Sequence, residues 1–151
     1  GAPGLRVGWA VGEPEVLARM RIVHGYAVTA AARPCQLAAL ALLEASDEVL
    51  PAAREEIAVR FEALKKARVR EFGGEVVPPA GGFYHFMPLP GSSLSDPWAF
   101  CVALRDQGCV VVVPGEVFGP AGRPFVRLSF AASPEQIDEG VRRLAPFWRA
   151  S

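Results

Sequence analysis

The sequence predicts an α/β chain whose second half is a small α+β domain, a small mixed sheet covered by helices and joined to the preceding residues by a long helix. Two observations indicate this. The second half alternates short runs of β-forming residues with helical patterns. Before it, an apolar stripe at helical spacing continues from Asp47 to Phe72, which is long for a globular helix and typical of a connector between two domains.

Composition limits the classes of function. A chain of 151 residues with 51% hydrophobic and 21% charged residues can bury a core as one ordinary domain with an appendage. Basic and acidic residues number 16 each, so charge gives no argument for binding nucleic acid or an anionic membrane surface. No apolar run reaches membrane-spanning length. Three cysteines without C-x-x-C spacing indicate small buried side chains in a reducing compartment, the cytoplasm.

The first 45 residues are expected to hold a glycine-rich turn, one strand and two helices. The strand is predicted at residues 6–11. A helix follows from Pro14 to His24, because proline is tolerated in the first turn of a helix. After a link of small residues, an Ala/Leu-rich helix is predicted at 34–45.

The long helix has signals at both ends. Ser46 and Asp47 can cap its start, and Pro51 lies in the first turn, where its missing N–H is not needed. Gly73 and Gly74 end it. Its apolar stripe consists of Leu50, Ile57, Phe61, Leu64 and Phe72.

Four strands are predicted in the second half. The first two, at 75–77 and 82–87, flank a Pro/Gly turn. The run 109–113 is wholly apolar and is expected to be the central strand. The fourth strand, 124–131, carries one arginine.

Two helices alternate with these strands. Pro97 begins the first, and Gly108 stops it. Ser133 and Gln136 form a capping-box pattern at the start of the last helix. The apolar stripe of this last helix is Ile137, Val141, Leu144 and Trp148.

Arg127 is the most informative residue, since it interrupts the apolar strand Phe125-Val-Arg-Leu-Ser-Phe130. Arginine stays protonated in proteins, so a cation on such a strand requires an anionic partner or an open site. The loop Pro114-Gly-Glu-Val-Phe-Gly119 lies just upstream. Together, strand, loop and arginine predict a pocket for a carboxylate. Neither histidine has a partner at metal-ligand spacing, so no metal site is predicted.

Several motifs in order resemble the C-terminal part of the class I/II aminotransferases, pyridoxal-phosphate enzymes of fold type I. They are Gly1-Ala-Pro-Gly-Leu-Arg-Val-Gly8, Cys35-Gln-Leu-Ala-Ala39, Pro79-Ala-Gly-Gly-Phe-Tyr84, Pro114-Gly-Glu-Val-Phe-Gly119 and Phe125-Val-Arg-Leu-Ser-Phe130. The resemblance implies that residues 1–45 are the remnant of the large cofactor domain, 46–74 the interdomain helix and 75–151 the small domain.

The resemblance also implies site residues and chemistry. Arg6 is expected to bind the phosphate of pyridoxal 5'-phosphate, and Arg127 the α-carboxylate of the amino acid. Tyr26 and Thr29 lie in the segment that approaches the neighbouring subunit's site in the family, which makes them further candidates. The implied activity exchanges an amino group between an amino acid and a 2-oxo acid, in a cytoplasmic homodimer.

The chain departs from the family at the catalytic residue. The Schiff-base lysine is expected upstream of Gly1, so no catalytic residue is predicted within these residues. Lys65 and Lys66 lie on the solvated face of the long helix and are poor substitutes. The chain is therefore expected to be a fragment or one piece of a longer protein, inactive in isolation.

Two alternatives remain open within this resemblance. A C–S lyase on the same fold would use the same two arginines, and only its products would distinguish it. Some transcription regulators carry an aminotransferase-like domain that binds cofactor and effector without turnover; this reading requires a winged-helix segment upstream.

Overall fold

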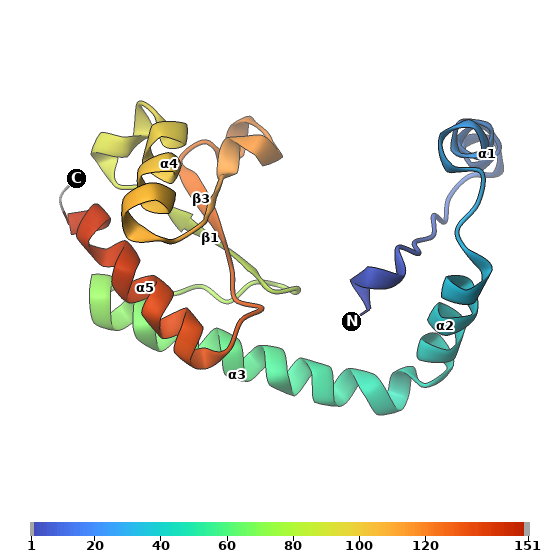
Figure 1. The fold of residues 1–151 in the computed structure, drawn as a ribbon, viewed down its shortest axis with the longest axis horizontal. Coiled ribbons are helices and arrows are strands. Elements are labelled where there is room, and N and C mark those ends of the chain that lie inside the picture. Colours follow the sequence, from blue (N-terminus) through green and yellow to red (C-terminus); the bar gives the residue numbers. More distant parts are fainter. Residues whose placement is uncertain (1, 150–151) are drawn as a thin grey trace. The chain divides into compact units, whose positions relative to one another are not determined.

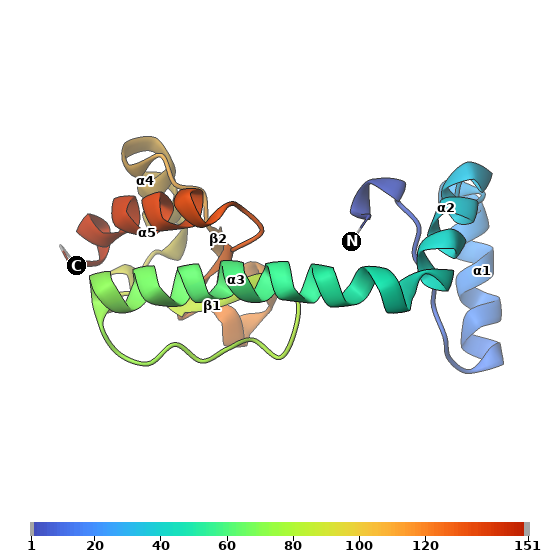
Figure 2. The ribbon, with the colours of Figure 1, turned by 90° about the horizontal axis from the view of Figure 1, so that it is seen from below.

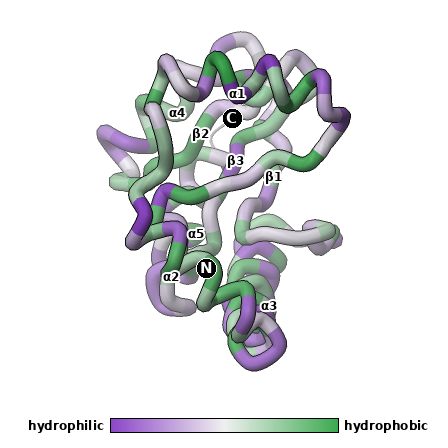
Figure 3. The backbone as a smooth tube through the Cα atoms, turned by 90° about the vertical axis from the view of Figure 1, so that its right-hand side faces the viewer, coloured by the Kyte–Doolittle hydropathy of each residue, from purple (hydrophilic) through white to green (hydrophobic). Residues whose placement is uncertain are grey.

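The computed structural model describes residues 2–149, apart from the side chains of Ser92 and Leu94. The described chain divides into two compact units, the first extending to Ala53 and the second starting at Arg54. This boundary falls inside the longest helix, α3 (Ser46–Phe72), which confirms the predicted long helix. Figure 3, which looks nearly along the axis of α3, shows both hydrophobic and hydrophilic residues on this helix.

The first unit consists of a 3-10 turn, η1 (Pro3–Leu5), two helices and the start of α3. Helices α1 (Pro14–Val28) and α2 (Arg33–Glu44) confirm both predicted helices, and each has a proline in its first turn. The strand predicted at 6–11 is wrong. Arg6 adopts a left-handed backbone with φ 53°. A strand also needs a partner strand to be stable, and within the described residues no strand pairs with this segment.

The second unit contains a sheet of three strands, β1 (Tyr84–Pro88), β2 (Val113–Pro114) and β3 (Phe125–Ser129), in the order β1-β3-β2. Figure 1 labels β1 and β3 of this sheet. Both pairings are antiparallel, so the predicted mixed sheet is wrong. The strand predicted at 75–77 is also absent from this sheet. The strand carrying Arg127 is confirmed, and it is the central one.

The apolar run 109–113 contributes only to a short edge strand, because the first residues of the run form the end of the preceding helix. Helix α4 (Pro97–Gly108) ends at Cys109, whose backbone is left-handed with φ 53°. The N–H of Val110 then donates to the carbonyl of Leu104 at 3.1 Å. This bond closes the end of the helix, and it leaves Val113 and Pro114 to pair with β3.

The core lies on one face of the sheet, where three helices cover it. Helices α3, α4 and α5 (Pro134–Arg149) supply the buried residues opposite the strands. Strand residues in this core are Met87, Val126 and Leu128; the helices contribute Leu64, Ala67, Phe100, Cys101, Leu104, Ile137, Val141 and Leu144. The predicted stripe of the last helix is confirmed as its inward face.

Helices α3 and α5 lie side by side (Figures 1 and 2). Arg70 of α3 forms an ion pair with Asp138 of α5 at 2.7 Å, and Glu71 of α3 forms one with Arg149 at 2.8 Å. The rings of Phe72 and Trp148 contact at 5.9 Å between centroids. The exposed ion pairs contribute little, so the buried apolar residues between the helices hold them together.

The predicted helix starts in the second unit, at Pro97 and at the Ser133 capping box, are both confirmed. The Asp96 carboxylate accepts a hydrogen bond from the N–H of Ala99 at 2.9 Å. The N–H of Gln136 donates to the Ser133 hydroxyl at 3.3 Å, and the N–H of Ser133 donates to the Gln136 side-chain oxygen at 3.2 Å. These reciprocal bonds are a capping box, which fixes where α5 begins after β3.

Loss of the Ser133 hydroxyl should destabilise the protein. In Ser133→Ala, the N–H of Gln136 loses its acceptor, so the free energy of unfolding should fall by about 1 kcal/mol in urea titration. Ser133→Asp retains an acceptor and should remain close to the original protein. Equal stabilities for the alanine variant and the original chain would show that the cap does not hold the helix.

His85 should make stability depend on pH. Burial, followed by the charge of Arg68, lowers the pKa of His85 from 6.5, and its Nε2 has no hydrogen-bond partner among the described residues. The unfolded chain therefore binds more protons below pH 6.5, so the free energy of unfolding should fall as pH drops below that value. Urea titrations between about pH 7.5 and 5.5 measure this slope.

His85→Gln removes the titrating group and should flatten the slope. His24 is exposed, so His24→Gln is the matched control and should retain it. A slope unchanged in the His85 variant and lost in the His24 variant would contradict the assignment.

Candidate functional site

Arg127 lies at the centre of the sheet, on the face away from the helices. On one side of β3 its cross-strand partner is Phe86 of β1, and on the other side it is Val113 of β2. Its neighbours Val126 and Leu128 are buried in the core, so the alternation of the strand points Arg127 to the opposite face. The side chain is half-buried.

Two aromatic rings enclose the guanidinium. Its Cζ atom lies 4.1 Å from the ring centroid of Tyr84 and 4.3 Å from that of Phe118. Both distances are within the range of cation–π contacts. Tyr84 belongs to β1, and Phe118 ends the 3-10 turn η3 (Gly115–Phe118).

No described residue forms a hydrogen bond or ion pair with the Arg127 guanidinium; every recorded ion pair involves other arginines or Lys65. With its Cζ atom over two rings, the group can still donate through its N–H groups, which no described residue accepts. An arginine in this state is suited to bind an external planar anion such as a carboxylate.

A cluster of rings supports the two that contact Arg127. Phe86 packs edge-on against Phe118 at 5.8 Å and against Phe125 at 6.4 Å. Phe83 contacts Tyr84 at 4.5 Å. The open face of the sheet is therefore an aromatic surface with one cation at its centre.

Two glycines hold the loop that carries Phe118. A Cβ on Gly115 would lie 2.2 Å from the carbonyl oxygen of Gly122 and 2.7 Å from that of Phe125. Gly122 ends the next 3-10 turn, η4 (Pro120–Gly122), and its own Cβ would lie 2.1 Å from the Gly115 oxygen. Only glycine permits this approach of two backbones, which sets the position of Phe118.

Arg6 lies in the first unit and is exposed. Its Nη1 donates to the carbonyl oxygen of Pro3 at 3.4 Å, and it has no ion pair with a described residue. A Cβ added at Gly4 or Gly8 would have no atom within 4 Å, so the backbone around Arg6 is open. An exposed guanidinium without an ion pair among the described residues, beside open glycine backbone, fits a phosphate group.

Tyr26 and Thr29 lie in and just after the last turn of α1. Tyr26 is 92% exposed. Thr29 has φ 63° and ψ −67°, and the N–H of Ala30 donates to the Val28 carbonyl at 2.7 Å, which together form a strained γ-turn. The sequence contains no signal for this turn, because a β-branched residue rarely adopts positive φ. Thr29 also lines a hollow with Trp9 and Gln36.

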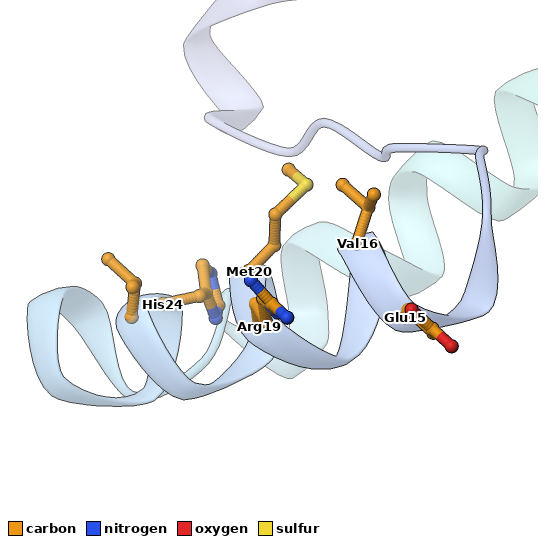
Figure 4. A pocket seen from close by; sticks show the side chains of 6 residues that line it. Glu15, Val16, Arg19, Met20 and His24 are labelled. Carbon is orange, nitrogen blue, oxygen red and sulfur yellow. The ribbon is translucent and has the colours of Figure 1, made fainter.

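A further hollow lies along α1 but lacks the features of a site. Figure 4 shows its lining side chains, all from this one helix: Glu15, Val16, Arg19, Met20, Val23 and His24. Val16 and Met20 point toward the N-terminal segment in this view. Among the described residues, no group of three or more His, Cys, Asp or Glu side chains could hold a metal ion. No described helix is long and apolar enough to cross a membrane.

Sequence reasoning placed Arg127 correctly on its strand but did not identify its ring partners. In the sequence, Tyr84 and Phe118 stand out only as members of two motifs, and nothing there indicates that either contacts Arg127. Lys65 and Lys66 are exposed on α3, and Lys65 lies 3.4 Å from Glu62 in an ion pair.

Gly115→Ala should disturb the loop. The added Cβ collides with two carbonyl oxygens, so the free energy of unfolding should fall by about 1–3 kcal/mol. Gly140 is the matched control, since it lies inside α5 with nothing within 4 Å of an added Cβ. Gly140→Ala should raise stability by about 0.5–1 kcal/mol. Stabilisation by both substitutions in thermal unfolding would contradict the close approach.

Comparisons with known proteins point to one family. Residues 1–144 match the family Aminotransferase class I and II. The LL-diaminopimelate aminotransferase of Dehalococcoides mccartyi is 32% identical over 148 residues, covering 98% of this chain and 37% of its own length. The aspartate aminotransferase of Pyrococcus horikoshii is 32% identical over 145 residues, covering 93% of this chain and 36% of its own.

Solved structures of aminotransferases show the same fold. An archaeal alanine:glyoxylate aminotransferase superposes with a TM-score of 0.83 at 26% identity, covering 99% of this chain and 38% of that one. The α-aminoadipate aminotransferase of Thermus thermophilus, complexed with N-(5'-phosphopyridoxyl)-L-leucine, gives 0.79 at 29% identity, covering 99% and 39%. The chain thus spans little more than a third of each of these relatives, and it belongs to the class I and II aminotransferase family.

Proposed function

We propose that this chain is the C-terminal portion of a pyridoxal-phosphate-dependent aminotransferase that exchanges an amino group between an amino acid and a 2-oxo acid. The observation that carries this proposal is the Arg127 guanidinium, whose Cζ atom lies over two aromatic rings and which has no ion pair among the described residues. Membership of the aminotransferase family supplies the class of reaction.

Arg127 binds the α-carboxylate of the amino acid in this proposal. Two parallel N–H···O bonds from its edge fix the plane of the carboxylate. With the carboxylate fixed, the orientation of the bond from Cα to hydrogen is constrained, which favours removal of that proton. The guanidinium stays charged throughout, so it binds amino acid and 2-oxo acid alike.

Arg6 holds the phosphate of the cofactor. Its exposed guanidinium and the open backbone at Gly4 and Gly8 fit this role. Pyridoxal phosphate, when bound, withdraws electrons from the Cα of the amino acid. Arg6 contributes charge and position and takes no part in proton transfer.

The lysine that carries the cofactor comes from outside these 151 residues. The two lysines of the chain, Lys65 and Lys66, are both exposed on the solvated side of α3. The chain therefore contributes binding groups, and in isolation it is inactive.

The exposed apolar residues of the first unit support an assembled protein. Helix α1 has no buried residue, although several of its side chains are large and apolar: Val16, Met20, Ile22, Val23, Tyr26 and Val28. A helix that is apolar on several sides is normally covered by other protein. A cytoplasmic homodimer fits this need and the three free thiols.

Arg127→Ala should raise the KM for the amino acid in the cofactor-loaded protein that contains this chain. Loss of a charge-assisted pair corresponds to a rise of about ten- to a hundredfold, while cofactor absorbance should stay unchanged. Arg123, an exposed arginine near the same loop, is the matched control, and Arg123→Ala should leave KM as it was. An unchanged KM in Arg127→Ala would contradict the assignment of Arg127 as the residue that binds the carboxylate.

The products of the same assay separate the two enzyme classes. An aminotransferase yields a 2-oxo acid and an aminated acceptor, whereas a C–S lyase yields pyruvate and ammonia. No turnover with tight binding of cofactor and amino acid would favour an effector-binding domain.

A further inference from the structure

We propose that Tyr84 and Phe118 are positioning residues, whose rings hold the Arg127 guanidinium so that a carboxylate meets only its edge. This inference rests on the proposed function, in which Arg127 binds the substrate carboxylate. The roles of the two rings are separate from the role of the arginine and can fail independently of it.

The two rings that contact the Arg127 guanidinium come from parts of the second unit that are far apart in the sequence. Tyr84 approaches the guanidinium from β1, with Cζ 4.1 Å from its ring centroid. Phe118 approaches from the loop after β2, at 4.3 Å. Phe86, on the neighbouring strand, packs edge-on against Phe118. No described residue accepts a hydrogen bond from the Arg127 guanidinium.

Contact with aromatic rings leaves the charge of Arg127 available to a ligand, whereas an ion pair within the protein would not. A carboxylate of the protein beside Arg127 would neutralise it and compete with the substrate. Aromatic rings attract the cation through their π faces and accept no N–H bond along its edge, so the charge remains available. Where the rings contact the guanidinium they also replace water, which strengthens the interaction with an incoming anion.

Orientation before binding reduces the entropic cost of binding. A free arginine side chain samples many rotamers, and a ligand that needs two parallel hydrogen bonds must select one of them. Between the rings the planar group is already ordered. The site is also accessible, since Tyr84 is 40% and Phe118 is 49% exposed.

The rings are themselves held in place. Phe118 follows the turn at which Gly115 contacts Gly122, and the N–H of Gly119 donates to the Glu116 carbonyl at 3.0 Å. Tyr84 is fixed by its pairing with Ser129 in the sheet. The Tyr84 hydroxyl has no recorded hydrogen bond with a described residue, so the ring and not the hydroxyl is expected to act.

The test compares ring-removing and ring-retaining substitutions in the cofactor-loaded protein that contains this chain. Tyr84→Leu and Phe118→Leu remove one ring each; Tyr84→Phe and Phe118→Tyr keep it. Each leucine variant should raise the KM for the amino acid about three- to tenfold, since a cation–π contact of ordinary strength is lost. The kcat should change less than twofold, and both ring-retaining variants should match the original protein.

A second measurement covers variants that lose activity through misfolding. In protein labelled with ¹⁵N in arginine, ring currents should shift the Arg127 Nε–H proton upfield, and Arg127→Lys identifies this signal. The upfield shift should shrink in each leucine variant and persist in Tyr84→Phe and Phe118→Tyr. An Arg127 signal without an upfield shift in the original protein overturns the inference.

The outcomes separate this inference from the proposed function. If Arg127→Ala raises KM but the leucine variants do not, the rings have no positioning role and the proposed function stands. If the leucine variants lower kcat and leave KM unchanged, the inference also fails. If Arg127→Ala leaves KM unchanged, both fail together, because the rings then have no ligand to position.

Discussion

Strand β3 is paired along both of its edges, and this double pairing sets which way each of its side chains faces. Val126 and Leu128 enter the core, and Arg127 between them faces the open side. A slip of one residue would bury the guanidinium without a partner and expose two apolar side chains, which is strongly unfavourable. The strand register therefore places both the core and the candidate site.

The covered face of the sheet gives the open face its rigidity. Helices α3, α4 and α5 pack against it through a continuous apolar cluster, and a close-packed interior allows little movement of the strands. The capping box of Ser133 and Gln136 starts α5 directly after β3. Arg127 thus projects from a strand that is fixed on its edges and from behind, a suitable basis for a site that needs accurate orientation.

The two units differ in how complete they are as folded structures. The second has its own core, whereas α1 and α2 of the first have no buried residue. The first unit also contains the strained γ-turn at Thr29, a conformation that surrounding structure must stabilise. These features fit a chain that spans a little over a third of its aminotransferase relatives.

The sequence by itself determined the helices and the candidate arginine. Helix signals such as the Ser133 capping box act within a few residues, so they can be recognised locally. Arg127 was recognisable because a cation conflicts with an apolar strand. Tertiary structure decided the strands, because a segment becomes a strand only where a neighbouring strand offers hydrogen bonds. In the segment 109–113, the first residues form the end of α4, and only Val113 pairs with β3. Tertiary structure also decided the stacking of Tyr84 and Phe118 on Arg127, because pairing of β1 with β3 and the contact of Gly115 with Gly122 join residues far apart in the chain.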